Sequence, residues 1–261
     1  MKNSRENIQE RRQALLDCLD RLPDHTASIT ILSDTLKVSA MTVRRDLKVL
    51  EEMGKLTHTY GQATLTDQPE QEGTTHSRSI ELIKTKLAEQ AASYISDNNS
   101  IFINSSSTAL GVVDYLQDLA LTIITNNLGI QNKQINSRST VILPGGEIRF
   151  PKKSLVGELA LKGLEKVYVD IAVMGCSGIS VQNGVSTYKI HESQINQLMI
   201  QHSTHAVILV ADYRKIGNDA NFFVSPLKNI DILITDIFAD EDEVRAIEAQ
   251  GIDVIQVDPT L

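Results

Sequence analysis

Short apolar runs that alternate with amphipathic stretches constrain the fold of this chain more than any other feature of its sequence. The runs occur at residues 100–104, 121–125, 140–143, 170–174, 205–210 and 230–235. Around them, residues 82–95, 108–119, 192–201 and 241–250 have helical spacing. Apolar runs of this length are typical of parallel strands that are buried on both faces. The alternation predicts a doubly wound α/β sheet with ligand sites at the carboxyl ends of its strands.

Several of these runs lead directly into small or polar residues. Hydroxyl groups, glycine amides and the start of a helix near Thr108 would together form a cradle for a phosphate group, and Lys215 would add a positive charge. The candidate effector-binding residues are Asn104, Ser105, Ser106, Ser107, Thr108, Thr125, Asn126, Gly145, Gly146 and Lys215. The alternative is that they form ordinary strand-to-helix turns, since no segment has a dinucleotide-binding or Walker pattern.

Residues 38–49 read as a capped helix with an apolar back and a basic front. Ser39 can cap its start, and Val43, Leu47 and Leu50 recur at helical spacing. Arginine can bind a guanine edge or a phosphate in a bidentate manner, so the basic side suits a DNA recognition helix. Its candidate DNA-binding residues are Ser39, Met41, Thr42, Arg44, Arg45 and Lys48. The alternative is a solvated helix face, in which the arginines pair with Asp46 or Glu51; we expect Asp46 to orient an arginine.

The flanking segments predict a winged helix-turn-helix. A helical stripe covers residues 5–22, and Ser28 can cap a short second helix that leads into the basic one. Residues 55–65 are rich in strand formers around Gly61 and predict a hairpin, the wing, in which His58 and Tyr60 are further candidates for DNA contact.

Charge and composition divide the chain into two parts. The whole chain has a net charge of −8, but residues 1–66 hold 10 Lys and Arg against 9 Asp and Glu, or +1. The remaining residues hold 15 against 24, or −9. Residues 67–77 lack apolar side chains and cannot bury a core. We therefore predict a DNA-binding domain at 1–66, a linker at 67–77 and an α/β sensing and oligomerisation domain at 78–261.

The remaining composition argues against several other classes of protein. Cys18 and Cys176 are the two cysteines, which supports neither a disulfide framework nor a zinc cluster, and the six histidines show no metal-binding spacing. We expect no metal and no cofactor. No apolar run approaches the ~18 residues of a membrane helix, and the start of the chain is polar, so we expect a cytoplasmic protein without membrane contact.

These segments resemble the DeoR family of bacterial transcription regulators over nearly the whole chain. The resemblance rests on residues 38–47 with Leu50, Glu51 and Gly54, and then on Lys84, residues 125–126, 144–146, 155–157, 175–178, 184–187 and 211–215. It implies a homodimer or homotetramer, usually a repressor of a carbohydrate operon, whose C-terminal domain binds a phosphorylated sugar and thereby changes its affinity for operator DNA. It also implies a C-terminal fold similar to sugar-phosphate isomerases, without catalysis.

Three features depart from the family pattern. Asn104 stands where the family usually carries Asp, and Asn196 stands where many members carry Lys. Both changes remove charge at or beside the candidate effector site, so the preferred effector is open. In the hairpin, His58 stands where Arg is common and Gln62 replaces a Gly. We therefore expect the helix to dominate DNA binding.

Two alternatives stay open. The α/β domain could isomerise or deaminate a sugar phosphate, with Asp212, Glu192 and Lys215 as acid and base candidates and the N-terminal part as a regulatory module. Turnover of a phosphosugar would distinguish this enzyme from a regulator. Activation in place of repression is also open, because it depends on where the operator lies relative to the promoter.

Overall fold

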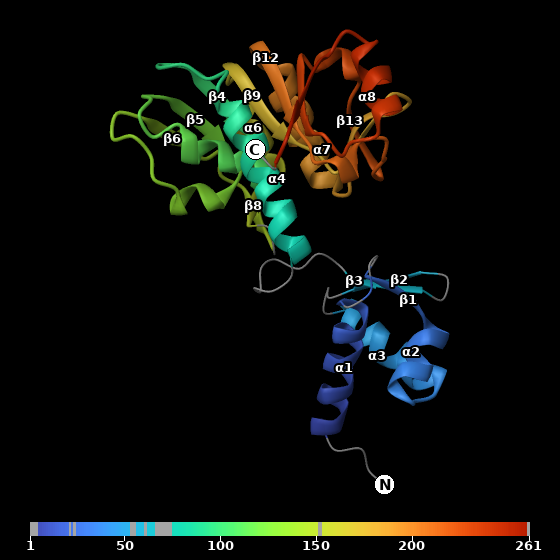
Figure 1. Cartoon of the computed structure of the whole chain (residues 1–261). Helices are drawn as coiled ribbons and strands as arrows, with labels where there is room; N and C mark the ends of the chain where they lie inside the picture. Colours follow the sequence, from blue (N-terminus) through green and yellow to red (C-terminus); the bar gives the residue numbers. More distant parts are fainter. Residues whose placement is uncertain are drawn as a thin grey trace. The chain divides into compact units, whose positions relative to one another are not determined.

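The chain folds into two compact units, Met1–Gly73 and Thr74–Leu261 (Figure 1). The computed structural model describes residues 5–20, 22, 25–52, 56–59, 62–65, 75–150 and 153–259. Most of the predicted linker lies outside these residues, but helix α4 begins at Thr75, so residues 75–77 are helical and not linker. The helix therefore begins about one turn before the buried Ile80.

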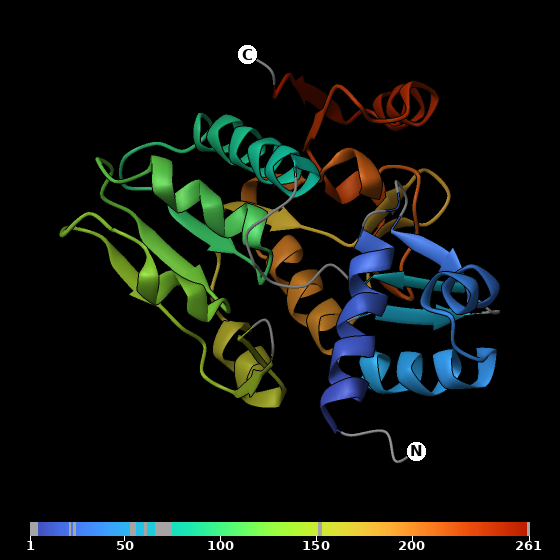
Figure 2. The same cartoon turned by 60° about the horizontal axis from the view of Figure 1, so that its bottom comes forward.

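The first unit contains three helices and a small antiparallel sheet (Figure 2). Its elements are α1 Arg5–Asp20, β1 Thr26–Ser28, α2 Ile29–Leu36, α3 Ala40–Glu52, β2 Leu56–Thr59 and β3 Gln62–Leu65. The strand order is β1-β3-β2, with β2 and β3 forming the predicted hairpin. This arrangement confirms the winged helix-turn-helix. Strand β1 was not predicted, because three residues are too few to show alternation.

Local hydrogen bonds fix the turn between α2 and α3. The Ser28 hydroxyl accepts from the Ile31 amide at 3.2 Å and caps α2, as predicted. Helix α2 ends at Leu36, and its C-cap residue Lys37 adopts the left-handed conformation common at helix ends. The Ser39 hydroxyl then accepts from the Thr42 amide at 3.2 Å and starts α3.

The second unit is built on a seven-stranded parallel sheet. Its strands are β4 Ser100–Ile103, β5 Thr122–Thr125, β6 Thr140–Ile142, β9 Val169–Gly175, β12 Ser203–Val210, β14 Ile232–Asp236 and β15 Asp253–Val257. The order is β15-β14-β12-β9-β4-β5-β6, so the chain winds in opposite directions from the neighbours β4 and β9. This doubly wound order confirms the predicted fold class. All the predicted strands occur, and β15 adds one that the sequence analysis missed.

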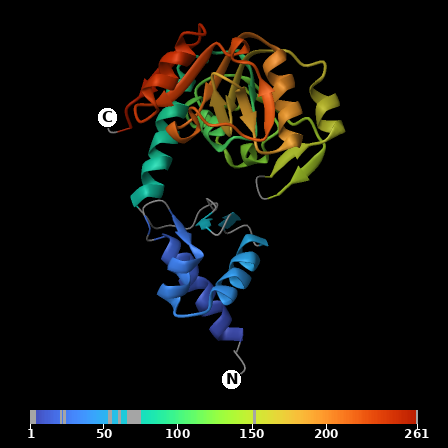
Figure 3. The same ribbon diagram turned by 90° about the vertical axis from the view of Figure 1, so that its right-hand side faces the viewer.

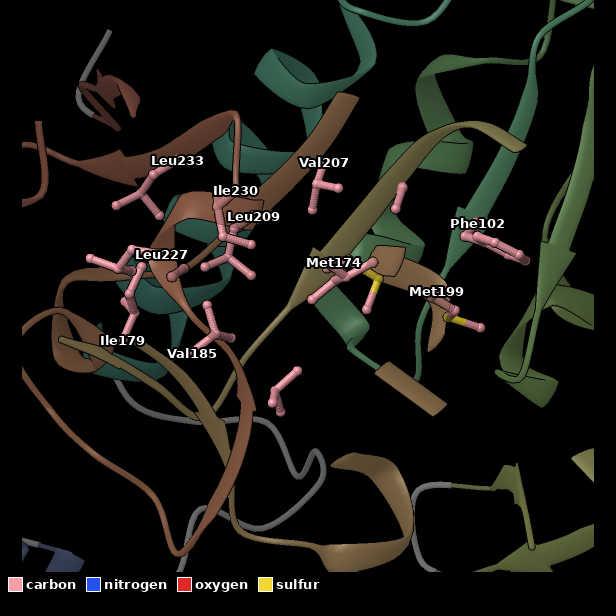
Figure 4. Packing of buried hydrophobic residues seen from close by; sticks show 14 of the residues in the cluster. Phe102, Met174, Ile179, Val185, Met199, Val207, Leu209, Leu227, Ile230 and Leu233 are labelled. Atoms are coloured by element: carbon pink, nitrogen blue, oxygen red, sulfur yellow. The ribbon is translucent and has the colours of Figure 1, made fainter. Parts of the chain in front are cut away.

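Alternating side chains of the strands fill a separate core on each face of the sheet. Ile101 and Ile103 lie in the cluster with helix α4, Thr75–Ala92, whereas Phe102 lies in the cluster with Met199 of helix α7, Ile190–Gln201. Figure 3 shows α4 and α7 on opposite sides of the sheet. Figure 4 shows Phe102 near Met199, and Leu209 farther along the sheet near Ile230 and Leu227, all in the same cluster. The continuous apolar runs are therefore buried on both faces, as predicted.

Shorter elements complete the second unit. They are the hairpin of β7 Glu147–Arg149 and β8 Ser154–Val156, the sheet of β10 Gly178–Ser180, β11 Gly184–Thr187 and β13 Phe222–Ser225, helices α5 Ser107–Gly111, α6 Glu158–Leu164 and α8 Glu241–Glu248, and 3-10 segments η1 Val112–Tyr115, η2 Leu128–Asn132, η3 Tyr213–Lys215 and η4 Leu227–Asn229.

The helix predicted at residues 108–119 is wrong in length. Helix α5 has five residues and continues as a 3-10 segment, because Gly111 and the β-branched Val112 and Val113 are poor helix formers. Within the described segments, every helix is too short or too polar to cross a membrane.

Candidate functional site

Helix α3 separates its basic residues from its apolar ones. The exposed residues include Met41, Arg44, Arg45 and Lys48, whereas Val43, Asp46, Leu47 and Leu50 are buried. Residues three, four and seven positions apart share one side of an α-helix, so the exposed set forms a single face. Ser39 is exposed at the start of this face, and its hydroxyl lies 2.9 Å from that of the half-buried Thr42. The predicted helix residues therefore lie together.

A buried carboxylate holds the inner side of α3 against α1. Asp46 is 1% exposed and accepts from Arg11 Nε at 2.6 Å and from Arg12 Nε at 3.0 Å. The prediction that Asp46 orients an arginine is confirmed, although its partners come from α1 and not from α3. This pairing leaves Arg44 and Arg45 without an ion pair to any residue that the structure describes. Their charge is therefore available to a polyanion.

The structure describes only part of the hairpin residues that were predicted to contact DNA. His58 lies in β2, opposite Ala63 of β3. The side chain of His58 and the whole of Tyr60 lie outside the described residues.

Asn104 lies at the point where the winding of the parallel sheet reverses. It directly follows β4, and its Nδ2 donates to the Gly175 carbonyl at the end of β9, 2.8 Å away. Its Oδ1 accepts from the amides of Gly175 at 3.0 Å and Ser106 at 3.2 Å. The crevice at such a reversal is the usual ligand site of open α/β sheets. Within it, the Asn104 side chain joins two strand ends.

Glycine is required at the end of β9 by the close approach of a neighbouring turn. A Cβ atom at Gly175 would lie 2.1 Å from Ser106 Oγ, well inside van der Waals contact. The Ser106 hydroxyl in turn accepts from the Ala109 amide at 3.4 Å and caps the short helix α5. In this turn Ser105 and Thr108 are buried and Ser107 is exposed. The predicted helix start is present, but α5 is too short to supply a full helix dipole.

The end of β5 lies beside hairpin β7–β8. The buried Thr125 donates from Oγ1 to the Ile103 carbonyl at 2.6 Å. Asn126 donates from Nδ2 to the Leu155 carbonyl at 3.1 Å, and no described residue forms a hydrogen bond with its buried Oδ1. This oxygen is an acceptor that protein groups have not used.

The glycine pair before β7 has a backbone conformation that other residues rarely adopt. Gly145 and Gly146 have φ values of 78° and 108°. A Cβ atom at Gly146 would lie 2.5 Å from the Val156 carbonyl oxygen, whereas one at Gly145 would meet no atom within 4 Å. Both residues are exposed and bring β7 alongside β8.

Lys215 lies at the carboxyl end of β12 in a cluster of charges. Its Nζ is 3.5 Å from Oδ2 of the buried Asp212, and Arg214 Nε donates to Oδ1 of the same carboxylate at 2.8 Å. Burial raises the pKa of Asp212, but the Arg214 hydrogen bond and the two positive charges outweigh it, and the net pKa is lowered. Burial also raises the pKa of the neighbouring Cys176 thiol to about 11. The thiol is therefore protonated at neutral pH and is a poor nucleophile.

A pocket that sequence analysis missed lies between hairpin β7–β8 and the start of α7. Its volume is about 290 Å³, and its polar lining residues are Arg149, Ser154, Tyr188, Lys189, His191 and Glu192. Ser154 directly precedes Leu155, the hydrogen-bond partner of Asn126. No run or spacing could have identified this pocket, because its residues come from two separate segments. The structure describes no cluster of three or more metal-ligating side chains in the residues it covers.

Known families match both units. The DeoR-like helix-turn-helix domain matches residues 11–69, and the DeoR C terminal sensor domain matches residues 81–237. The uncharacterized HTH-type transcriptional regulator YulB of Bacillus subtilis (strain 168) is 30% identical over 253 residues, which cover 96% of this chain and 97% of that protein.

Two further proteins are similar to this chain. The glycerol-3-phosphate regulon repressor of Escherichia coli (strain K12) is 29% identical over 78% of this chain and 82% of that protein. Ribose 5-phosphate isomerase A of Methanocaldococcus jannaschii superposes on 52% of this chain and 54% of that chain, with 15% identity and a TM-score of 0.38. From its two matched domains, the chain belongs to the DeoR family of helix-turn-helix transcriptional regulators, a family of regulators and not of enzymes.

Proposed function

We propose that this regulator represses a carbohydrate-utilisation operon and releases its operator when a phosphorylated sugar binds. The observation that carries the DNA half is the exposed basic face of α3, whose arginines make no ion pair with a described residue. Recognition helices present such side chains to base edges and phosphates in the major groove. The similar protein from Escherichia coli is named a glycerol-3-phosphate regulon repressor, which supports repression and a phosphorylated effector.

The proposal that a phosphorylated sugar binds rests on the strand ends near β4 and β9, where the winding of the sheet reverses. The strand ends there carry Asn104, Asn126 and Lys215, and within the described part of the chain Asn126 Oδ1 lacks a hydrogen-bond partner. Polar turns and backbone amides at the carboxyl ends of parallel strands suit a small polyol phosphate. We assign the effector to this edge, with the ten candidate residues of the sequence analysis as its surroundings.

Release follows from linkage between the two sites. An effector lowers DNA affinity only if it binds the arrangement that is not competent for DNA more tightly. A 100-fold effect needs about 2.7 kcal/mol of such differential affinity. We further propose that the regulator acts in the cytoplasm as a homodimer or homotetramer, since paired recognition helices read two half-sites on one operator.

Fluorescence anisotropy tests this function directly. The full chain is titrated onto labelled DNA from upstream of its own gene and its neighbours, at one fixed salt concentration, because phosphate contacts make affinity depend steeply on salt. The titration is repeated with a panel of sugars in phosphorylated and unphosphorylated form. Specific binding that one phosphorylated sugar weakens, and its unphosphorylated form does not, supports the proposal. Specific binding that no phosphorylated sugar alters would remove its effector half.

A further inference from the structure

The pocket between hairpin β7–β8 and the start of α7 is lined by two half-exposed cationic side chains. Arg149 of β7 and Lys189, the N-cap residue of α7, both line it, as does His191 of the first turn. The Arg149 and Lys189 side chains are 50% and 43% exposed, so both can reach a ligand from solvent. Their nearest acidic partners are Glu147 at 3.3 Å and Glu192 at 3.8 Å. These distances are long for charge-assisted hydrogen bonds, so neither cation is tightly engaged.

The start of α7 adds backbone donors to the same pocket. This helix has 12 residues, and no side chain caps its first turn. An N-terminus of this kind carries partial positive charge and amide groups that bind anions. The Glu192 carboxylate of the same turn lies 3.8 Å from Lys189 Nζ and only partly balances this charge, because that distance is longer than a direct hydrogen bond. The helix end and the cations therefore favour the same kind of ligand.

Ser154 provides an independent sign that a ligand binds here. It lines the pocket, is 1% exposed, and its hydroxyl has no hydrogen-bond partner among the residues that the structure describes. A buried hydroxyl that is left unpaired is destabilising, so such groups are rare unless a ligand or water completes them. A ligand oxygen in the pocket would satisfy it.

We propose that this pocket binds the phosphate group of the effector. Arg149, Lys189, the Ser154 hydroxyl and the first amides of α7 surround the phosphate oxygens. The Glu192 carboxylate, which accepts from Thr187 Oγ1 at 3.5 Å, repels the phosphate toward Arg149 and Ser154 and faces the hydroxyl groups of the sugar. The volume of about 290 Å³ suits a small polyol phosphate. This assignment rests on the proposed function for the identity of the ligand, but its phosphate site can be tested alone.

Calorimetric titration of the full chain with inorganic phosphate and with glycerol 3-phosphate, in a phosphate-free buffer of constant ionic strength, tests the site. We expect Arg149→Gln and Lys189→Gln each to weaken binding by at least about 10-fold. Ser154→Ala removes no charge and is expected to weaken phosphate binding about 5-fold. Nonspecific electrostatic attraction would be unchanged in this variant. Lys162→Gln, at a 62% exposed lysine of α6, is the matched control and is expected to bind as the wild type.

The outcomes separate this inference from the proposed function. No binding by the wild type, or equal binding by the pocket variants and the control, overturns the phosphate site. Because Arg149 and Lys189 are half-exposed, their variants keep the test valid even if Ser154→Ala unfolds. The same variants are then assayed for DNA release. Release that survives in variants without phosphate binding places the effector elsewhere, whereas phosphate binding without release by any phosphorylated sugar overturns the proposed function and keeps the pocket.

Discussion

The side-chain amides of Asn104 and Asn196 meet in the buried interior, with Asn104 Nδ2 3.2 Å from Asn196 Oδ1. They are 1% and 4% exposed. In the sequence, both positions depart from the pattern that the family resemblance implies, and in the structure they form an uncharged pair. The pair links the end of β4 to α7, the helix whose first turn lines the proposed phosphate site.

Asn104→Asp is expected to destabilise the second unit by about 2 kcal/mol. The new carboxylate loses the donor to the Gly175 carbonyl and places negative charge beside Asn196 Oδ1. Adding Asn196→Lys supplies a cation and is expected to recover about 1 kcal/mol. Urea unfolding of both single variants and the double variant measures this coupling. Strictly additive effects would show that the two side chains do not interact.

Arg44→Ala and Arg45→Ala are each expected to weaken operator binding by about 10- to 100-fold, corresponding to roughly 1 to 3 kcal/mol for a lost base or phosphate contact. If the contact is to a phosphate, the salt dependence of binding also becomes shallower by about one unit. Anisotropy at several salt concentrations measures both quantities. Binding of inorganic phosphate should not change, because the substituted residues belong to the other unit. Wild-type DNA affinity in both variants would remove this face of α3 from the interface.

Asp46→Asn is expected to lower the unfolding free energy of the first unit by about 1 to 3 kcal/mol. The substitution removes the charge that Arg11 and Arg12 share, and these two arginines then lie close together without a counter-ion. Asp34→Asn, at an exposed residue of α2, is the matched control and should change stability by less than about 0.5 kcal/mol. Thermal unfolding followed by circular dichroism compares the two. Equal midpoints would mean that the buried carboxylate contributes nothing to packing of α1 on α3.

The lowered pKa of Asp212 predicts how the second unit responds to acid. Burial raises this pKa, but the hydrogen bond from Arg214 and the charges of Arg214 and Lys215 lower it by more. The net pKa of Asp212 is therefore below its ordinary value of 3.8. The folded state therefore binds this proton less readily than the unfolded state. Its stabilisation is complete above about pH 3.8 and is lost as the pH falls below that value through the lowered pKa. The stability difference between wild type and Asp212→Asn should narrow over this acid range in urea unfolding. A difference that stays constant with pH would contradict the assignment.

The sequence predicts the fold well where periodicity is strong. Apolar runs such as residues 205–210 are buried on both faces, so their pattern is that of a parallel strand, and β12 lies there. The capping residues Ser28 and Ser39 act locally and were also predictable. The three-residue strands β1 and β8 were missed, whereas the equally short β6 was predicted because Leu143 extends its apolar run.

The DNA-binding face and the effector site also differ in how well the sequence could predict them. The basic face of α3 follows from helical spacing within one segment, so its residues could be grouped from the sequence. The effector edge depends on contacts across long separations, such as Asn104 with Gly175 and Asn126 with Leu155. The sequence could place the strand ends at one edge of the sheet. It could not place hairpin β7–β8, which lies beside the end of β5. The pocket at Ser154 and Lys189 was therefore beyond sequence analysis.

Lys215→Ala tests whether the far side of the effector edge contributes to the response. Because Lys215 Nζ is 3.5 Å from Asp212 Oδ2, its charge is already partly balanced, and we assign it to hydrogen bonding with a sugar hydroxyl, leaving the phosphate to the pocket at α7. The concentration of phosphorylated sugar that half-releases DNA is then expected to rise about 10-fold. Binding of inorganic phosphate should stay unchanged. Lys228→Ala, at an exposed lysine of η4, is the control. An unchanged release curve would remove Lys215 from the effector site, and a parallel loss of inorganic phosphate binding would place the phosphate beside Lys215.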